Sequence, residues 1–125
     1  MAEVTYQMRR HKPINEAVLR SIRRYVRSVQ DSIPVEAAIL YGSHASGNQG
    51  PESDIDLAIV SSRFKDFAKD MATLIRKKYD IDRRIEPLAV TPEDLNHPEP
   101  GSIFEEINRY GQVVYPEPKE GSDLD

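Results

Sequence analysis

The sequence predicts a small α/β fold, in which helices cover one sheet and a site lies at the ends of strands. Two short apolar runs, 35–41 and 55–60, are typical of buried strands because turn-forming residues bound them. Apolar residues also recur at helical spacing before and after these runs. The elements therefore follow the order helix, strand, strand, helix, strand, helix, strand, and this mixture favours a sheet covered by helices.

The chain has 125 residues, which is enough for one domain with a single core. We expect that domain to span residues 1–115. Residues 116–125 are rich in proline and acidic side chains, and this composition predicts a disordered tail.

The composition argues against several classes of protein. The formal charge is −4, with 17 basic and 21 acidic residues, which does not favour a dedicated nucleic-acid binder. Because the chain has no cysteine, disulfides, thiolate nucleophiles and cysteine-bound zinc are impossible. No apolar run approaches the roughly 20 residues that span a bilayer, and the first residues lack the apolar core of a secretory signal. We therefore expect a soluble cytoplasmic protein.

The first helix is predicted to begin at Pro13, whose missing N–H group suits a first helical position. Residues 31–34 are expected to end it. Its apolar stripe has helical spacing and consists of Ile14, Val18, Ile22, Tyr25 and Val29. Four arginines lie mostly off that stripe: Arg20, Arg23, Arg24 and Arg27. Charge patterning favours a solvated helix face for them over a contact surface for phosphate, RNA or an acidic partner.

Between the two apolar runs, residues 43–47 are expected to form one helical turn and residues 48–53 a loop marked by glycine and proline. A second helix is expected to begin near Asp66. Its apolar residues again have helical spacing: Phe67, Met71, Leu74, Ile75 and Tyr79.

A third strand is expected over residues 83–90. Because Pro87 cannot donate a hydrogen bond to a neighbouring strand, this strand should lie at an edge or be bulged. Thr91 and Pro92 are typical of the N-cap and first position of a short helix. A last helix and a short strand are expected at 102–110 and 112–115, with the helix burying Ile103, Phe104 and Ile107.

A Gly-Ser pair follows the first strand. Gly42 has no side chain, so a phosphate can approach the backbone closely there, and Ser43 offers a backbone N–H and a hydroxyl group. If a helical turn begins at Ser43, its free N–H groups and its dipole favour an anion. The pair therefore predicts a phosphate-binding turn.

Two carboxylates open the second strand. Asp54 and Asp56 are two residues apart, so on a strand both point to the same face, about 6.5 Å apart along the chain. A divalent cation relieves their repulsion, and magnesium prefers oxygen ligands from carboxylates and substrate phosphates. Two such ions can bind a nucleoside triphosphate and activate an attacking hydroxyl group.

A third carboxylate on the neighbouring strand would complete such a site, and Glu86 is the first candidate. It stands between Ile85 and Pro87, where a charged residue in an apolar run needs an explanation. Asp80 and Asp82 are rivals, although both precede the strand. Glu86 is alternatively an ordinary solvent-facing residue, since edge strands often carry charge.

The stretch GSHASGNQGPESDIDLAIV, residues 42–60, resembles the signature of the DNA polymerase β-like nucleotidyltransferase superfamily, and most of all its minimal nucleotidyltransferases, the MntA-like antitoxins. The resemblance covers most of residues 37–114 and implies a mixed sheet, the nucleotidyltransferase fold, two magnesium ions and ATP as donor. Gly42 and Ser43 match the family's phosphate-binding pair. Asp54 and Asp56 match its two metal ligands, and Glu86 matches its third acidic position, where the acceptor hydroxyl loses its proton.

Two departures from the family pattern stand out. Many relatives carry an arginine in the turn after Gly-Ser, where this chain has His44, Ala45 and Ser46. For His44, a contact with phosphate is one alternative, but a lone exposed loop histidine is more often incidental, and we favour that interpretation. The third acidic residue is a glutamate followed by Pro87. Other nucleotide motifs, the P-loop and G-x-G-x-x-G, are not present in the sequence.

The sequence therefore predicts transfer of a nucleoside monophosphate, AMP from ATP, to a hydroxyl group. Larger relatives bind the acceptor with a second helical domain. No part of this sequence is long enough for such a domain, so we expect the acceptor surface to belong to another protein. The resemblance implies a HEPN-domain toxin with a tyrosine acceptor, for which the arginine-rich helix is one docking face. Self-association of the chain is left open. The alternatives are a non-catalytic module that neutralises its partner by covering it and, less favoured by the charge, an RNA-binding module.

Overall fold

The computed structural model describes residues 13–46 and 53–116. The described elements are, in chain order, α1 (Glu16–Gln30), β1 (Ala37–Tyr41), α2 (Ser43–Ser46), β2 (Ile55–Val60), α3 (Phe67–Lys78), β3 (Ile85–Val90), α4 (Pro92–Asn96), α5 (Ile103–Tyr110) and β4 (Gln112–Tyr115). The strands form one sheet in the order β3-β2-β1-β4. Strand β1 runs antiparallel to β2 and β4, whereas β2 and β3 are parallel. The predicted mixed sheet flanked by helices is therefore confirmed.

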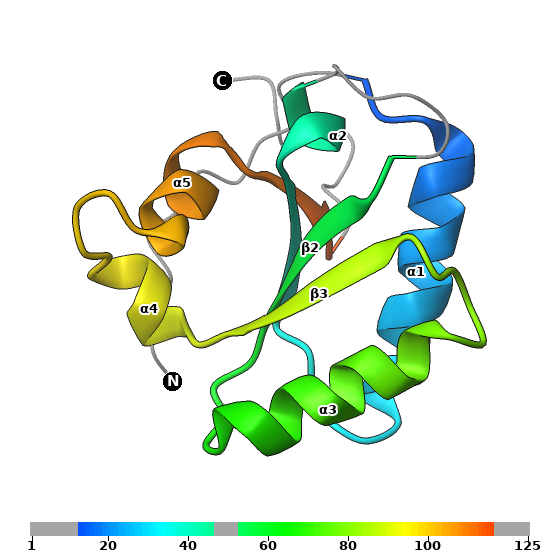
Figure 1. Cartoon of the computed structure of the whole chain (residues 1–125), viewed down its shortest axis with the longest axis horizontal. Helices are drawn as coiled ribbons and strands as arrows, with labels where there is room; N and C mark the ends of the chain where they lie inside the picture. Colours follow the sequence, from blue (N-terminus) through cyan, green and yellow to red (C-terminus); the bar gives the residue numbers. More distant parts are fainter. Residues whose placement is uncertain (1–12, 47–52, 117–125) are drawn as a thin grey trace.

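Helices cover both faces of the sheet, with α1 and α3 on one face and α4 and α5 on the other (Figure 1). Successive strand residues point to opposite faces. In β2, Ile55, Leu57 and Ile59 therefore pack toward α1 and α3, while Ala58 and Val60 pack toward α4 and α5. Asp56 shares the second face with Ala58, so the alternation places its carboxylate on the side of the sheet that α5 covers.

Helix α1 begins later than predicted. The side chain of Asn15 accepts hydrogen bonds from the backbone N–H groups of Ala17 (2.8 Å) and Val18 (3.2 Å), which makes Asn15 the N-cap. Pro13 therefore lies before the helix, and the prediction that placed it at the first helical position was wrong. Of the four arginines, Arg20, Arg24 and Arg27 are exposed, which fits both a solvated face and a contact surface.

Helix α3 buries less of its apolar stripe than the sequence suggested. Only Leu74 and Lys78 are buried, while Phe67, Ile75 and Tyr79 are 61%, 38% and 53% exposed. The helix lies against the edge strand β3, so there is too little sheet beneath it to cover the whole stripe. Ile103 of α5, which was also predicted to be buried, is 41% exposed and is the first residue of its helix.

Strand β3 lies at an edge of the sheet, which confirms the prediction made from Pro87. Pro87 pairs with Leu57 in a parallel register that runs without a shift from Ile85 to Val90. The capping box of Thr91 and Asp94 confirms the predicted start of α4. No helix within residues 13–46 and 53–116 is long and apolar enough to cross a bilayer. The loop at 48–52 and the tail after 116 fall outside the described residues.

Candidate active site

The turn after β1 is built around Gly42. Its φ angle of +74° lies in the left-handed region, which favours glycine. A β-carbon at this position would collide with the carboxylate of Asp56. The sequence predicted that glycine would allow a close approach here, and in the structure the approaching group is a carboxylate. Ser43 follows as the first residue of α2.

Strand pairing brings the three predicted acidic residues to one end of the sheet. Asp56 is half-buried, lies opposite Tyr41 of β1 and lies opposite Glu86 of β3. Neighbouring strands are about 4.8 Å apart, so Asp56 and Glu86 share one face at that spacing. Asp54 is exposed and precedes β2 by one residue.

Several acidic groups act on the carboxylate of Asp56. Its pKa is raised first by burial and then by the negative charges of Asp54, Glu86 and Glu106, whereas His44 lowers it. Glu106 comes from α5 and was not predicted from the sequence, because only the fold places α5 over this face of the sheet. A cation near Asp56 would relieve the repulsion.

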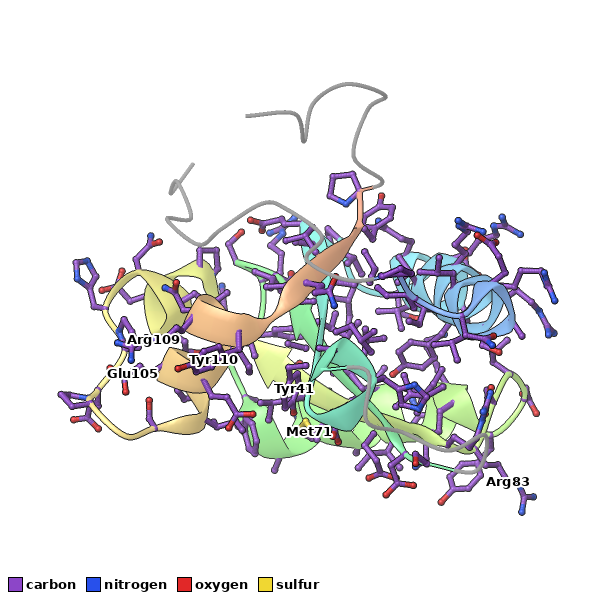
Figure 2. All side chains as sticks on the ribbon, turned by 90° about the horizontal axis from the view of Figure 1, so that it is seen from above. Tyr41, Met71, Arg83, Glu105, Arg109 and Tyr110 are labelled. Carbon is purple, nitrogen blue, oxygen red and sulfur yellow. The ribbon has the colours of Figure 1, made fainter. Side chains whose placement is uncertain are left out.

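Tyr41 stands beside the same acidic groups. Burial, followed by the charges of Asp56, Glu106 and Glu86, raises the pKa of its phenol to about 12. Figure 2 shows Tyr41 near the centre of the molecule, next to α2. The phenol therefore stays protonated at neutral pH and presents a neutral polar group to the site.

Glu86 is paired with a lysine that sequence reasoning left without a role. Its Oε2 atom lies 3.0 Å from Nζ of Lys78, the last residue of α3. The Lys78 side chain is only 9% exposed, while that of Glu86 is 49% exposed. Among the residues that the structure describes, no three acidic or histidine side chains lie close enough together to form a metal site as they stand.

The site nevertheless offers the donor chemistry that magnesium prefers. Asp54, Asp56 and Glu86 supply carboxylate oxygens from one end of the sheet, and Gly42 leaves room for the carboxylate of Asp56. The pKa of Asp56 is raised by burial and, after that, by the nearby negative charges, which a cation would offset. The three carboxylates therefore fit a divalent cation by their chemistry, and strand register places two of them, Asp56 and Glu86, opposite each other.

His44 is not the exposed loop residue that the sequence suggested. It belongs to α2, is only 4% exposed, and its Nε2 atom lies 3.3 Å from the carbonyl oxygen of Ser53. His44 thus links α2 to the segment just before Asp54. The sequence around His44 contains mainly small and polar residues, and this pattern does not reveal that the histidine is buried.

Gln112 of β4 holds α2 in place through a hydrogen bond to its backbone. Its side chain is fully buried, and its Nε2 atom donates to the carbonyl oxygen of Ala45 at 2.7 Å. Replacing Gln112 with leucine leaves that carbonyl without this donor, so we expect a loss of about 1–3 kcal/mol in unfolding free energy and weaker nucleotide binding. Denaturant titration and the KM for nucleotide measure the two effects.

Gln30→Leu is a matched control, because Gln30 also donates to a backbone carbonyl, that of Val35 at 3.1 Å, but lies at the end of α1. We expect it to lower stability without changing the nucleotide KM. Equal KM changes in both variants would contradict an anchoring role for Gln112.

The chain matches the protein family described as "Polymerase beta, Nucleotidyltransferase" over residues 24–120, which is most of its length. The chain belongs to this nucleotidyltransferase family. The matched span includes all of the candidate residues, Gly42, Ser43, Asp54, Asp56 and Glu86. The resemblance drawn from residues 42–60 is thereby confirmed at the level of the family.

A similar protein is known from Methanocaldococcus jannaschii under the name "Putative protein adenylyltransferase MJ0604". It is 28% identical to this nucleotidyltransferase over 98 residues, which cover 77% of this chain and 96% of the relative. The two proteins therefore correspond over nearly the whole of the relative. Family and relative together support nucleotidyl transfer as the general activity.

Proposed function

We propose that this nucleotidyltransferase moves AMP from ATP to a hydroxyl group of a partner protein. The observation that carries the proposal is the pairing of Asp56 with Glu86 across parallel strands, directly against the Gly42 turn. This arrangement puts carboxylates beside a turn suited to phosphates, as a nucleotide-binding site requires. The name of the Methanocaldococcus jannaschii relative supports a protein as acceptor.

Each residue has a role in the proposed reaction. The turn at Gly42 and Ser43 binds the β- and γ-phosphates through backbone N–H groups. Two magnesium ions would bind, held by Asp54 and Asp56, and Glu86 would complete the second metal site. Bound magnesium would neutralise the charge of the phosphates.

Glu86 takes the proton of the acceptor hydroxyl group in the proposed mechanism. The acceptor oxygen then forms a bond to the α-phosphorus while the bond from that phosphorus to the bridging oxygen of the β-phosphate breaks. Pyrophosphate leaves with the electron pair of that bond. The product is a phosphodiester between AMP and the acceptor, and the proton on Glu86 is later lost to water.

The acceptor is proposed to be a tyrosine of a HEPN-domain protein, within a toxin–antitoxin pair in the cytoplasm. The acceptor surface is assigned to the partner in this proposal. Helix α1 is the candidate docking face, because Arg20, Arg24 and Arg27 are exposed together on it. An acidic surface on the partner would complement them.

Incubation of the purified pair with magnesium and radiolabelled ATP tests the proposal. Label in the α-phosphate should appear on the partner, and label in the γ-phosphate should not, because the γ-phosphate leaves within pyrophosphate. Transfer of γ-label, or no transfer at all, would contradict it. If a variant with alanine at both Asp54 and Asp56 still neutralised the partner, the chain would act by covering the partner instead.

A further inference from the structure

Lys78 is the buried charged side chain of α3, and its position is unusual for a lysine. Long cationic side chains are seldom buried unless they are paired, because removing a charge from water is costly. Lys78 is 7% exposed. Its ammonium group lies 5.6 Å from the centre of the Tyr79 ring, within the range of a cation–π contact.

The anionic partner of Lys78 is the third acidic residue of the candidate site. Nζ of Lys78 contacts Oε2 of Glu86 at 3.0 Å. The second oxygen, Oε1, receives no hydrogen bond from the residues that the structure describes. The backbone of Lys78 has a separate task, since its carbonyl oxygen accepts bonds from Ile81 and Asp82 in the turn to β3. A side-chain substitution leaves that turn intact.

Lys78 also balances the charge of the site. Asp54, Glu86 and Glu106 all act on Asp56 as negative charges. Lys78 pairs with Glu86 and so offsets the charge of one of these carboxylates. The same positive charge must oppose the approach of a divalent cation.

We propose that Lys78 is a positioning residue of the site: its ammonium group holds one oxygen of Glu86, leaves the other free, and weakens metal binding through its own charge. The inference rests on the proposed function, because it takes Glu86 as part of the metal and acceptor site. It assigns Lys78 two separable effects, one on the orientation of Glu86 and one on metal affinity.

Two variants separate these effects. Lys78→Met keeps the length of the side chain but removes both charge and donor, so we expect tighter Mn²⁺ binding by about three- to tenfold and a kcat lower by roughly tenfold. Lys78→Gln removes the charge but keeps a donor for Glu86. It should tighten Mn²⁺ binding to a similar degree while retaining more of the kcat.

The experiment is a Mn²⁺ titration of the full chain followed by electron paramagnetic resonance, with kcat measured separately. Lys77→Met is the matched control, because it removes the same charge one residue away, and we expect both quantities to stay near the wild type. Asp56→Asn should lose Mn²⁺ binding. If Lys78→Met does not fold, Lys78→Gln alone tests the effect of the charge.

Unchanged or weaker Mn²⁺ binding in the folded Lys78 variants would overturn the inference. That result would mean that the charge of Lys78 does not oppose the metal and that the lysine has only a structural role. Wild-type binding that Asp56→Asn abolishes would leave the proposed function standing in that case. Failure of the wild type to bind Mn²⁺ would overturn both.

Discussion

Replacing Asp56 with asparagine is expected to abolish nucleotidyl transfer while making the metal-free protein more stable. The carboxylate lies against the Gly42 turn and opposite Glu86, at the centre of the candidate site. Loss of a carboxylate that holds the catalytic cation should reduce kcat/KM by about 100-fold or more. The asparagine is nearly isosteric, so the fold should not change.

The gain in stability follows from the pKa of Asp56. Burial and three neighbouring carboxylates raise that pKa above its ordinary value of 3.8, so the folded state favours the protonated group. This contribution is fully present below pH 3.8 and is lost as the pH rises through the folded-state pKa. Asp56→Asn should therefore raise the melting temperature at neutral pH and much less in acid.

Melting curves without metal at neutral and acidic pH, together with a transfer assay, measure the two effects. Asp80→Asn is the matched control, because Asp80 is an exposed acidic residue that follows α3 and lies outside the site. We expect it to change neither activity nor the pH profile. An Asp56→Asn protein that still transferred AMP would remove Asp56 from the active site.

The sequence predicted the strands that carry the site because their signals are local. The apolar run at 55–60 and the proline at 87 each depend on neighbours within a few residues, and both predictions are confirmed. Asp56 and Glu86 lie opposite each other because strands β2 and β3 pair in parallel. Whether these residues perform catalysis remains a prediction.

The remaining features depend on contacts between distant segments. Glu106 reaches the neighbourhood of Asp56 only because α5 covers that face of the sheet. Helical periodicity placed Ile75 and Tyr79 in a buried stripe, but periodicity does not reveal that an edge strand leaves part of a helix uncovered. The burial of His44 likewise depends on the return of the chain to Ser53.

Replacing Gly42 with alanine is expected to damage both stability and transfer. Left-handed backbone costs a residue with a β-carbon about 1–2 kcal/mol, and φ of Gly42 is +74°. The new methyl group would also displace the carboxylate of Asp56. We expect a loss in unfolding free energy beyond the backbone cost, and a fall in kcat/KM of about 100-fold, measured by denaturant titration and transfer assay.

Gly101 provides a control that isolates the collision. Its φ angle is +80°, yet a β-carbon there would meet no atom within 4 Å, so Gly101→Ala carries the backbone cost alone. The extra cost of Gly42→Ala should shrink when Asp56 is also alanine, because the displaced carboxylate is then gone. If Gly42→Ala cost no more than Gly101→Ala and kept its activity, the close contact between the turn and Asp56 would have no part in the reaction.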